Sequence, residues 1–151
     1  LDPNIRPALV GSHATALARF EQAARVADLV KLSDEDAEWL YPGAAPEEVL
    51  ETIAALGPRL VVMTRGEQGA LGLGPGGIMS VEPLRVEVAD TIGAGDAYMA
   101  SLISSALEHP EIFDDAQAFA TALRRAAVMA GITVSRAGAN PPTRAEIDRA
   151  L

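Results

Sequence analysis

The sequence contains no cysteine, few aromatic residues and no long hydrophobic run. Without cysteine, the chain can form no disulfide and can offer no thiolate as a nucleophile or a metal ligand. Aromatic residues make up only 4% of the chain, so its core must be built mainly from Ala, Leu, Val and Ile. No apolar segment approaches the roughly 20 residues that a transmembrane helix requires. We therefore expect no disulfide scaffold, no membrane partner and a cytoplasmic location.

The charged residues are unevenly divided between the two signs. The chain has 12 Lys and Arg residues against 21 Asp and Glu residues, which gives a net charge of −9 at pH 7. Its largest basic cluster is the pair Arg124 and Arg125, whereas binding to a nucleic-acid backbone needs a concentrated basic surface. We therefore expect no nucleic-acid partner. With 151 residues, 49% of them hydrophobic, the chain can bury the core of one ordinary domain.

The spacing of apolar residues predicts strands that alternate with helices. The predicted helices cover residues 13–27, 33–40, 46–56, 95–108 and 113–131, and a last one starts near residue 143. The predicted strands cover residues 28–32, 59–64, 70–73, 78–81 and 86–88. Such an alternation indicates a layered α/β fold with a mostly parallel sheet.

The most informative segment is 90–96, with the sequence DTIGAGD, which leads directly into an amphipathic helical pattern. The small residues Gly93, Ala94 and Gly95 let the backbone approach a ligand closely, and their N–H groups lie at a helix N-terminus, which favours an anion. Asp96 follows in the same turn, where the helix terminus favours the ionised form that a proton acceptor needs. A carboxylate beside an anion site is suited to phosphoryl transfer to a hydroxyl group.

A bare GxGD pattern would more often be a glycine turn capped by an aspartate. The complete motif is more specific, because it stands between a predicted strand and an amphipathic helix. This context favours the phosphate site over the simple turn.

Segment 90–96 also resembles the signature of the ribokinase-like, or PfkB-type, carbohydrate kinases. Further segments are similar to motifs of this family and follow in the family's order. They are 2–6 (DPNIR), 31–36 (KLSDED), 61–69 (VVMTRGEQG) and 132–139 (ITVSRAGA). The resemblance covers essentially the whole chain and implies a three-layer α/β/α ribokinase-like fold. DPNIR, together with Ser33, is most similar to fructokinase-type members.

The resemblance implies roles for the residues at the reacting end. Asp96 would be the catalytic base, and Gly93, Ala94 and Gly95 would form the anion hole. The substrate-binding residues that it implies are Asn4, Arg6 and Asp96. Without the resemblance, segment 2–6 would be interpreted as a turn, because Asp-Pro and Pro-Asn pairs favour turns.

The resemblance also implies a nucleotide site for ATP. Thr64 and Gly66 would line this site, and Ala127 and Gly131 would lie near the adenine. Lys31 has two interpretations, a strand-end charge in solvent or a neighbour of the phosphates, and we prefer the first.

Two metal sites are implied by the same family. Asp36 would help to organise Mg²⁺ through water, since Mg²⁺ keeps several waters and needs few direct carboxylates. Ser33 and Asp36 fit a helix capping box equally well. Asp90 resembles part of the family's monovalent cation site, for which K⁺ is the candidate. Pro142 stands where ribokinase-type members offer that cation a side-chain oxygen.

Members of the family are longer than this chain, and the glycine-rich sugar-binding motifs and the lid of their first half have no counterpart here. We therefore interpret residues 1–151 as a partial domain, the C-terminal nucleotide-binding half of a sugar kinase, inactive alone. Fructose is the first candidate substrate, and 2-keto-3-deoxygluconate, ribose and a nucleoside are alternatives. A homodimer is an option for the intact enzyme. A non-catalytic nucleotide- or sugar-binding regulator is the alternative from another class.

Overall fold

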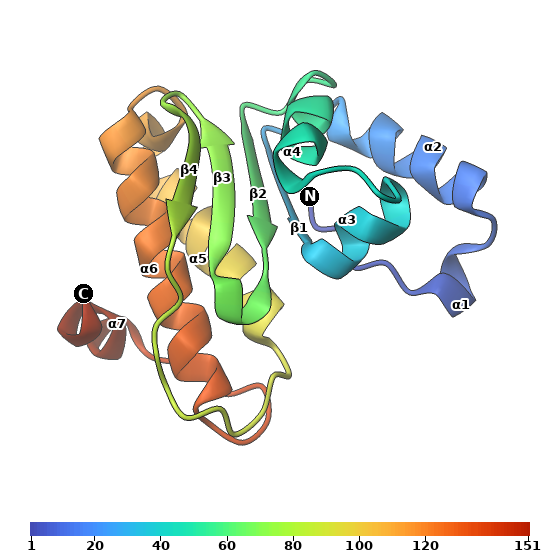
Figure 1. Cartoon of the computed structure of the whole chain (residues 1–151). Coiled ribbons are helices and arrows are strands. Elements are labelled where there is room, and N and C mark those ends of the chain that lie inside the picture. Colours follow the sequence, from blue (N-terminus) through green and yellow to red (C-terminus); the bar gives the residue numbers. More distant parts are fainter.

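Helices cover both faces of a small central sheet in the computed structural model, which describes residues 1–151 (Figure 1). The strands are β1 (Leu29–Ser33), β2 (Leu60–Thr64), β3 (Ala70–Gly74) and β4 (Gly77–Val81). The α-helices are α1 (Pro7–Val10), α2 (His13–Ala24), α3 (Asp34–Leu40), α4 (Pro46–Ala54), α5 (Ala94–Glu108), α6 (Ala116–Val134) and α7 (Arg144–Ala150). Two short 3₁₀ helices, η1 (Gly66–Gln68) and η2 (Pro110–Phe113), complete the chain. None of the helices combines the length and the apolar character that a bilayer crossing would need.

The sheet has the strand order β1-β2-β3-β4 and is mixed. β1 and β2 run parallel, with Leu29 opposite Leu60 and Ser33 opposite Thr64. β3 and β4 continue the sheet as antiparallel neighbours. The parallel pair is joined through α3 and α4, as a parallel connection requires, whereas the short links after β2 and β3 allow only antiparallel pairing. The parallel arrangement predicted from the apolar runs therefore holds for β1 and β2, and β3 and β4 form a hairpin.

Alternate residues of the strands serve two separate halves of the core. Leu60 and Val62 of β2 belong to a cluster with α5 and α6, while Val61 and Met63 pack with α2, α3 and α4. This division follows from the alternation of side chains along a strand, and it explains why β2 reads as a continuous apolar run. Figure 1 shows α5 and α6 on one side of the sheet and α2 to α4 on the other.

Two short helices begin with the capping boxes that their sequences favour. The Ser33 hydroxyl accepts a hydrogen bond from the Asp36 N–H at 3.0 Å, and Asp36 Oδ2 accepts one from the Ser33 N–H at 3.1 Å. Thr143 and Glu146 form the equivalent pair at the start of α7. These caps satisfy N–H groups that the first turn of a helix leaves free.

The predicted strand at 86–88 is wrong, because this segment has no regular structure. It lies between β4 and α5 and pairs with no strand. Instead, the N–H groups of Ala89 and Asp90 both donate to the carbonyl of Val134 at the end of α6. The alternation of valines at 86 and 88 therefore does not correspond to a place in the sheet. The helix predicted at 113–131 is confirmed, but it begins and ends about a turn later.

Candidate functional site

The turn 90–93 brings the first turn of α5 to the surface of a cavity. Gly93 has a φ of +79°, in the left-handed region that glycine adopts without strain, and α5 begins at the next residue, Ala94. Of the residues predicted for the anion hole, Gly93 and Gly95 have N–H groups without an acceptor in the chain, whereas the Ala94 N–H donates to Thr91 O at 3.3 Å. The N–H of Asp96, which was not predicted as a donor, is also free. The free donors of Gly95 and Asp96, at the positive end of a fifteen-residue helix, form an anion-binding arrangement.

The Asp90 carboxylate stabilises this turn through hydrogen bonds to the backbone. Its Oδ1 accepts a hydrogen bond from the Ile92 N–H at 3.0 Å, and its Oδ2 accepts one from the Gly138 N–H at 3.0 Å. These backbone donors, that of Ile92 first, lower the pKa of the Asp90 carboxyl below its usual value. The loop after α6 is thereby joined to the turn before α5. Asp90 thus links the backbone at Ile92 to the backbone at Gly138.

A cavity of about 600 Å³ extends from the first turn of α5 along α6. Ala94 and Gly95 line one end of it, and its polar lining also includes Thr64, Gly66 and Thr91. The rest of the wall combines apolar residues (Pro83, Leu84, Val86, Val88, Ala127, Ala130 and Val134) with Gly69, Tyr98, Gly131 and the charged residues Glu67, Glu82 and Arg85. A cavity that has free N–H donors at the start of α5 and apolar residues along α6 is suited to a ligand that carries phosphates and a flat hydrophobic ring.

The structure brings together, from distant segments of the chain, the residues predicted to bind the nucleotide. Thr64, the last residue of β2, and Gly66, the first of η1, line the same cavity as Ala127 and Gly131 of α6. Sequence reasoning missed Tyr98, which also lines the cavity and whose hydroxyl donates to Leu123 O at 3.3 Å. Burial raises the pKa of Tyr98 far above its usual value, so the phenol stays neutral. The only feature of the sequence that could have indicated this role is the position of Tyr98 shortly after the motif 90–96.

Asp96 is the third residue of α5, and its side chain is exposed. It accepts no hydrogen bond from the chain and does not line the cavity, although the neighbouring Gly95 does. The carboxylate is therefore unengaged, beside the free N–H groups of the first turn. Its role as a base remains a prediction.

The segment 1–6 is held in place by two buried charged residues. Asp36 Oδ1 accepts a hydrogen bond from the Ile5 N–H at 2.8 Å, and Lys31 Nζ donates to Asp2 Oδ2 at 3.0 Å. Between these tethers Asn4 adopts a positive φ of 45°, which supports the interpretation of the segment as a turn. The side chains of Asn4 and Arg6 are exposed, and Arg6 Nη1 donates only to the carbonyl of Ile5. Their contact with a substrate remains a prediction.

The preferred interpretation of Lys31 as a strand-end charge in solvent is wrong. Its side chain is only 4% exposed and is paired with Asp2. Lys31 alternates with Val30 and Leu32 along β1, so it points to the α5 side of the sheet, where the turn 93–95 approaches. A lysine inside a short apolar strand was the signal that could have revealed this.

Asp36 has a clear structural role at the start of α3. Both of its oxygens accept backbone hydrogen bonds, from Ile5 and from Ser33, and the residue is buried. No group of three or more His, Cys, Asp or Glu side chains is positioned to hold a metal ion by itself. The residues present therefore fit Mg²⁺ only in the way Mg²⁺ commonly binds, through water and ligand phosphates.

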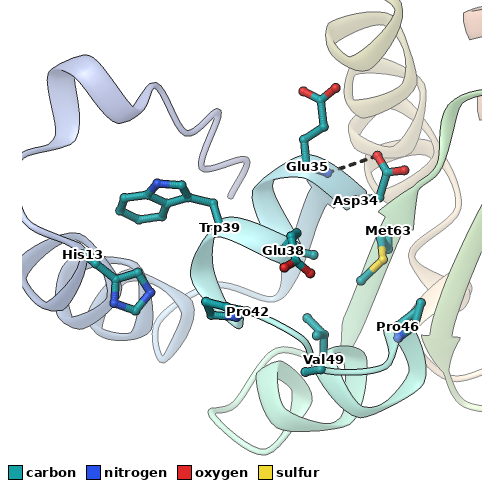
Figure 2. Close-up of a pocket in the computed structure, with 11 residues that line it drawn as sticks. His13, Asp34, Glu35, Glu38, Trp39, Pro42, Pro46, Val49 and Met63 are labelled. Carbon is teal, nitrogen blue, oxygen red and sulfur yellow. Dashed lines mark hydrogen bonds between the residues drawn. The ribbon is translucent and has the colours of Figure 1, made fainter.

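A second, separate cavity of about 900 Å³ lies on the other side of the sheet, between α2, α3 and α4 (Figure 2). Its wall combines the acidic side chains of Asp34, Glu35 and Glu38 with apolar residues that include Trp39 and Met63. It shares no residue with the cavity beside α5. None of the residues predicted for the site lines it.

Comparison with known proteins decides the family. The model of the pfkB family carbohydrate kinases matches residues 1–146. The chain belongs to this family. Its resemblance to a PfkB-type kinase, drawn from five sequence motifs, is therefore confirmed.

Individual pfkB relatives include fructokinases. A fructokinase of Rhizobium leguminosarum bv. trifolii is 37% identical over 105 residues, which cover 70% of this chain and 32% of the relative. Fructokinase-2 of Oryza sativa subsp. japonica is 31% identical over 143 residues, which cover 93% of this chain and 42% of the relative. The chain thus spans less than half the length of these relatives.

Solved structures of the pfkB kinases share the fold. A fructokinase of Vibrio cholerae O395, in a form with fructose, ADP and calcium ion bound, has a TM-score of 0.86 and 29% identity over 98% of this chain and 48% of its own. A putative ribokinase II of E. coli, in complex with ATP and Mg²⁺, has a TM-score of 0.81 and 25% identity over 98% of this chain and 46% of its own. The α/β fold expected from the sequence is confirmed as the ribokinase-like fold.

Proposed function

We propose that residues 1–151 are the C-terminal, nucleotide-binding half of an ATP-dependent sugar kinase, inactive alone, with fructose as the first candidate substrate. The observation that carries this proposal is the pair of free N–H groups in the first turn of α5, on Gly95, which lines the cavity, and on the neighbouring Asp96. The fructokinase relatives support the choice of sugar. Because the chain spans less than half of those relatives, the other half would supply the rest of the sugar site.

The reaction would transfer the γ-phosphoryl group of ATP to a sugar hydroxyl. A bond forms between the hydroxyl oxygen and the γ-phosphorus, the bond from that phosphorus to the β,γ-bridging oxygen breaks, and ADP leaves. The N–H groups of Gly95 and Asp96 would bind the transferring group, and the Asp96 carboxylate would accept the hydroxyl proton. A strong base is not needed, because in a loose transition state the proton leaves late.

The ATP molecule would lie along the cavity, with its phosphates at the α5 end. Thr64 and Gly66 would border the phosphates or ribose, and Ala127 and Gly131 would contact the adenine. Asp36 would hold Mg²⁺ through water, and this ion would neutralise charge on the phosphates. K⁺ is a candidate near Asp90, whose lowered pKa keeps a negative charge there.

The segment 1–6 would provide part of the sugar site. Asp2 is joined through Lys31 to the first turn of α5, so this segment lies beside the anion-binding amides. Asn4 and Arg6 are exposed on it and are the candidates to contact the sugar. The acidic charge of −9 argues against a nucleic-acid partner. The homodimer, which is an option for the intact enzyme, and the cytoplasmic location remain predictions.

The test is the Asp96→Asn variant of the full-length protein. Turnover with ATP, Mg²⁺ and fructose should fall by roughly two to four orders of magnitude, which is the usual contribution of a positioned base. ATP affinity, measured by calorimetry, should persist. Near-normal turnover would refute the assignment of Asp96. A panel with ribose, 2-keto-3-deoxygluconate and a nucleoside would separate fructose from the alternative substrates, and no turnover with any of them would refute the proposal.

A further inference from the structure

Lys31 is buried between the segment 1–6 and the first turn of α5. Its Nζ donates to Asp2 Oδ2 at 3.0 Å, and the two side chains are only 4% and 10% exposed. On the opposite side, a Cβ atom built at position 95 would lie 2.9 Å from the same Nζ. The ammonium group therefore lies against the backbone of Gly95. A side chain at position 95 would therefore displace the end of Lys31 from the first turn of α5.

The ammonium group of Lys31 lies beside backbone donors that already favour an anion. The free N–H groups of Gly95 and Asp96 form the positive end of α5, and the ammonium group of Lys31 adds a like charge beside them. Asp2 offsets that charge with one oxygen, while its buried Oδ1 has no hydrogen-bond partner. A buried ion pair is a weak source of stability, because desolvation opposes the attraction between its charges. Stability alone therefore does not explain this arrangement.

We propose that Lys31 is a positioning residue that strengthens phosphoryl binding at the N-terminus of α5, and that Asp2 is the counter-charge that limits this attraction. Because its own side chain is buried, Lys31 would not contact the phosphates directly. Its charge would add to the attraction of the N–H groups in the turn at Gly95. The inference rests on the proposed function, in which ATP phosphates occupy this turn. It assigns Asp2 a role in tuning anion affinity in addition to shaping the segment 1–6.

Two single variants of the full-length protein separate this role from a structural one. Lys31→Met and Asp2→Asn each leave one buried partner uncompensated, so both should lower the melting temperature. Their effects on the Kd of ATP should be opposite. Lys31→Met should weaken binding and Asp2→Asn should tighten it, each by roughly five- to thirty-fold for a unit charge several ångströms from the phosphates. The double variant should give a Kd between those of the single variants.

Glu47→Gln is the matched control, because it removes one negative charge from an exposed position on α4, and it should leave the Kd unchanged. Calorimetry of ATP binding, without sugar, measures the Kd independently of turnover. A Kd that rises in both single variants, or changes in neither, would overturn the inference. A wild-type protein that binds ATP but phosphorylates no sugar would refute only the proposed function, and one that binds no ATP would refute both.

Discussion

The contact between Gly131 and Leu84 determines how closely one wall of the cavity approaches α6. A Cβ atom at position 131 would lie 2.5 Å from the Cβ of Leu84 and 3.2 Å from its Cγ and Cδ2. Neither Cβ atom can rotate away, because each is attached directly to the backbone. Leu84 belongs to the segment between β4 and α5, which has no regular structure and lines the cavity. The Gly131→Ala variant must therefore move this segment away from α6.

Two opposing effects decide the stability of that variant. Replacing glycine by alanine inside a helix stabilises it by about 1 kcal/mol. Overpacking against Leu84 costs about 1–3 kcal/mol. We expect a net loss of up to about 2 kcal/mol in the free energy of unfolding, together with weaker ATP binding, since the displaced segment forms the apolar end of the cavity.

A double-mutant cycle with Leu84→Gly isolates the contact, because only glycine removes the Cβ atom that lies 2.5 Å away. In the Leu84→Gly background the clash is relieved, so Gly131→Ala should now stabilise the protein by about 1 kcal/mol from helix propensity alone. The coupling between the two positions should therefore be about 1–3 kcal/mol. Urea unfolding of the four full-length proteins measures it. An equal effect of Gly131→Ala in both backgrounds would show that Leu84 does not pack on α6 as described.

Two further predictions concern the caps. Hydrogen bonds from the Thr143 backbone and hydroxyl, and then from Arg136, lower the pKa of Glu146 to about 2 from a usual value of 4.5. A carboxylate with a lowered pKa stabilises the fold above pH 4.5 and loses this effect as the pH falls towards 2. The difference in the free energy of unfolding between the wild type and Glu146→Gln should therefore be largest at pH 6 and decrease as the pH falls from 4.5 towards 2. A difference that does not depend on pH would contradict the assignment. Ser33→Ala should lower the free energy of unfolding by about 1 kcal/mol, because it removes a helix cap. Asp36→Ala should lower it by at least about 2 kcal/mol, because it leaves the Ile5 and Ser33 N–H groups without an acceptor. Urea unfolding measures both losses, and equal losses would show that the Ile5 hydrogen bond contributes nothing.

Local sequence patterns were sufficient to predict most helices and strands. The capping residues Ser33 and Thr143 mark the starts of α3 and α7, and the apolar run 59–64 marks β2. These features depend on neighbouring residues, so they are visible in the sequence. The prediction of a strand at 86–88 is wrong because its valines alternate as in a strand, while the backbone that follows, at Ala89 and Asp90, bonds to the end of α6, about 45 residues later. Nothing local distinguishes these two environments.

The candidate site was predictable to the extent that its residues lie in motifs. The resemblance to the family assigns residues 64, 66, 127 and 131 to one ligand, and they line one cavity. The apolar wall formed by Leu84, Val86 and Val88 was not predicted, since it depends on how an irregular segment crosses α6. The pairing of Lys31 with Asp2 was also missed, because it depends on contacts across 29 positions of the sequence.

The parallel pair of strands explains why the separate motifs meet. β1 and β2 end at Ser33 and Thr64 on the same edge of the sheet, where parallel α/β folds usually bind their ligands. Leu1 lies beside β1, because its carbonyl accepts a hydrogen bond from the Lys31 N–H, and the segment 2–6 leaves the sheet at the same edge. The start of α5 reaches this edge through the contact of Gly95 with Lys31. A single buried lysine therefore touches the segment assigned to the sugar and the turn assigned to the phosphate, so a change at Lys31 should alter both substrate affinities, whereas a change at Gly131 should alter only that for ATP.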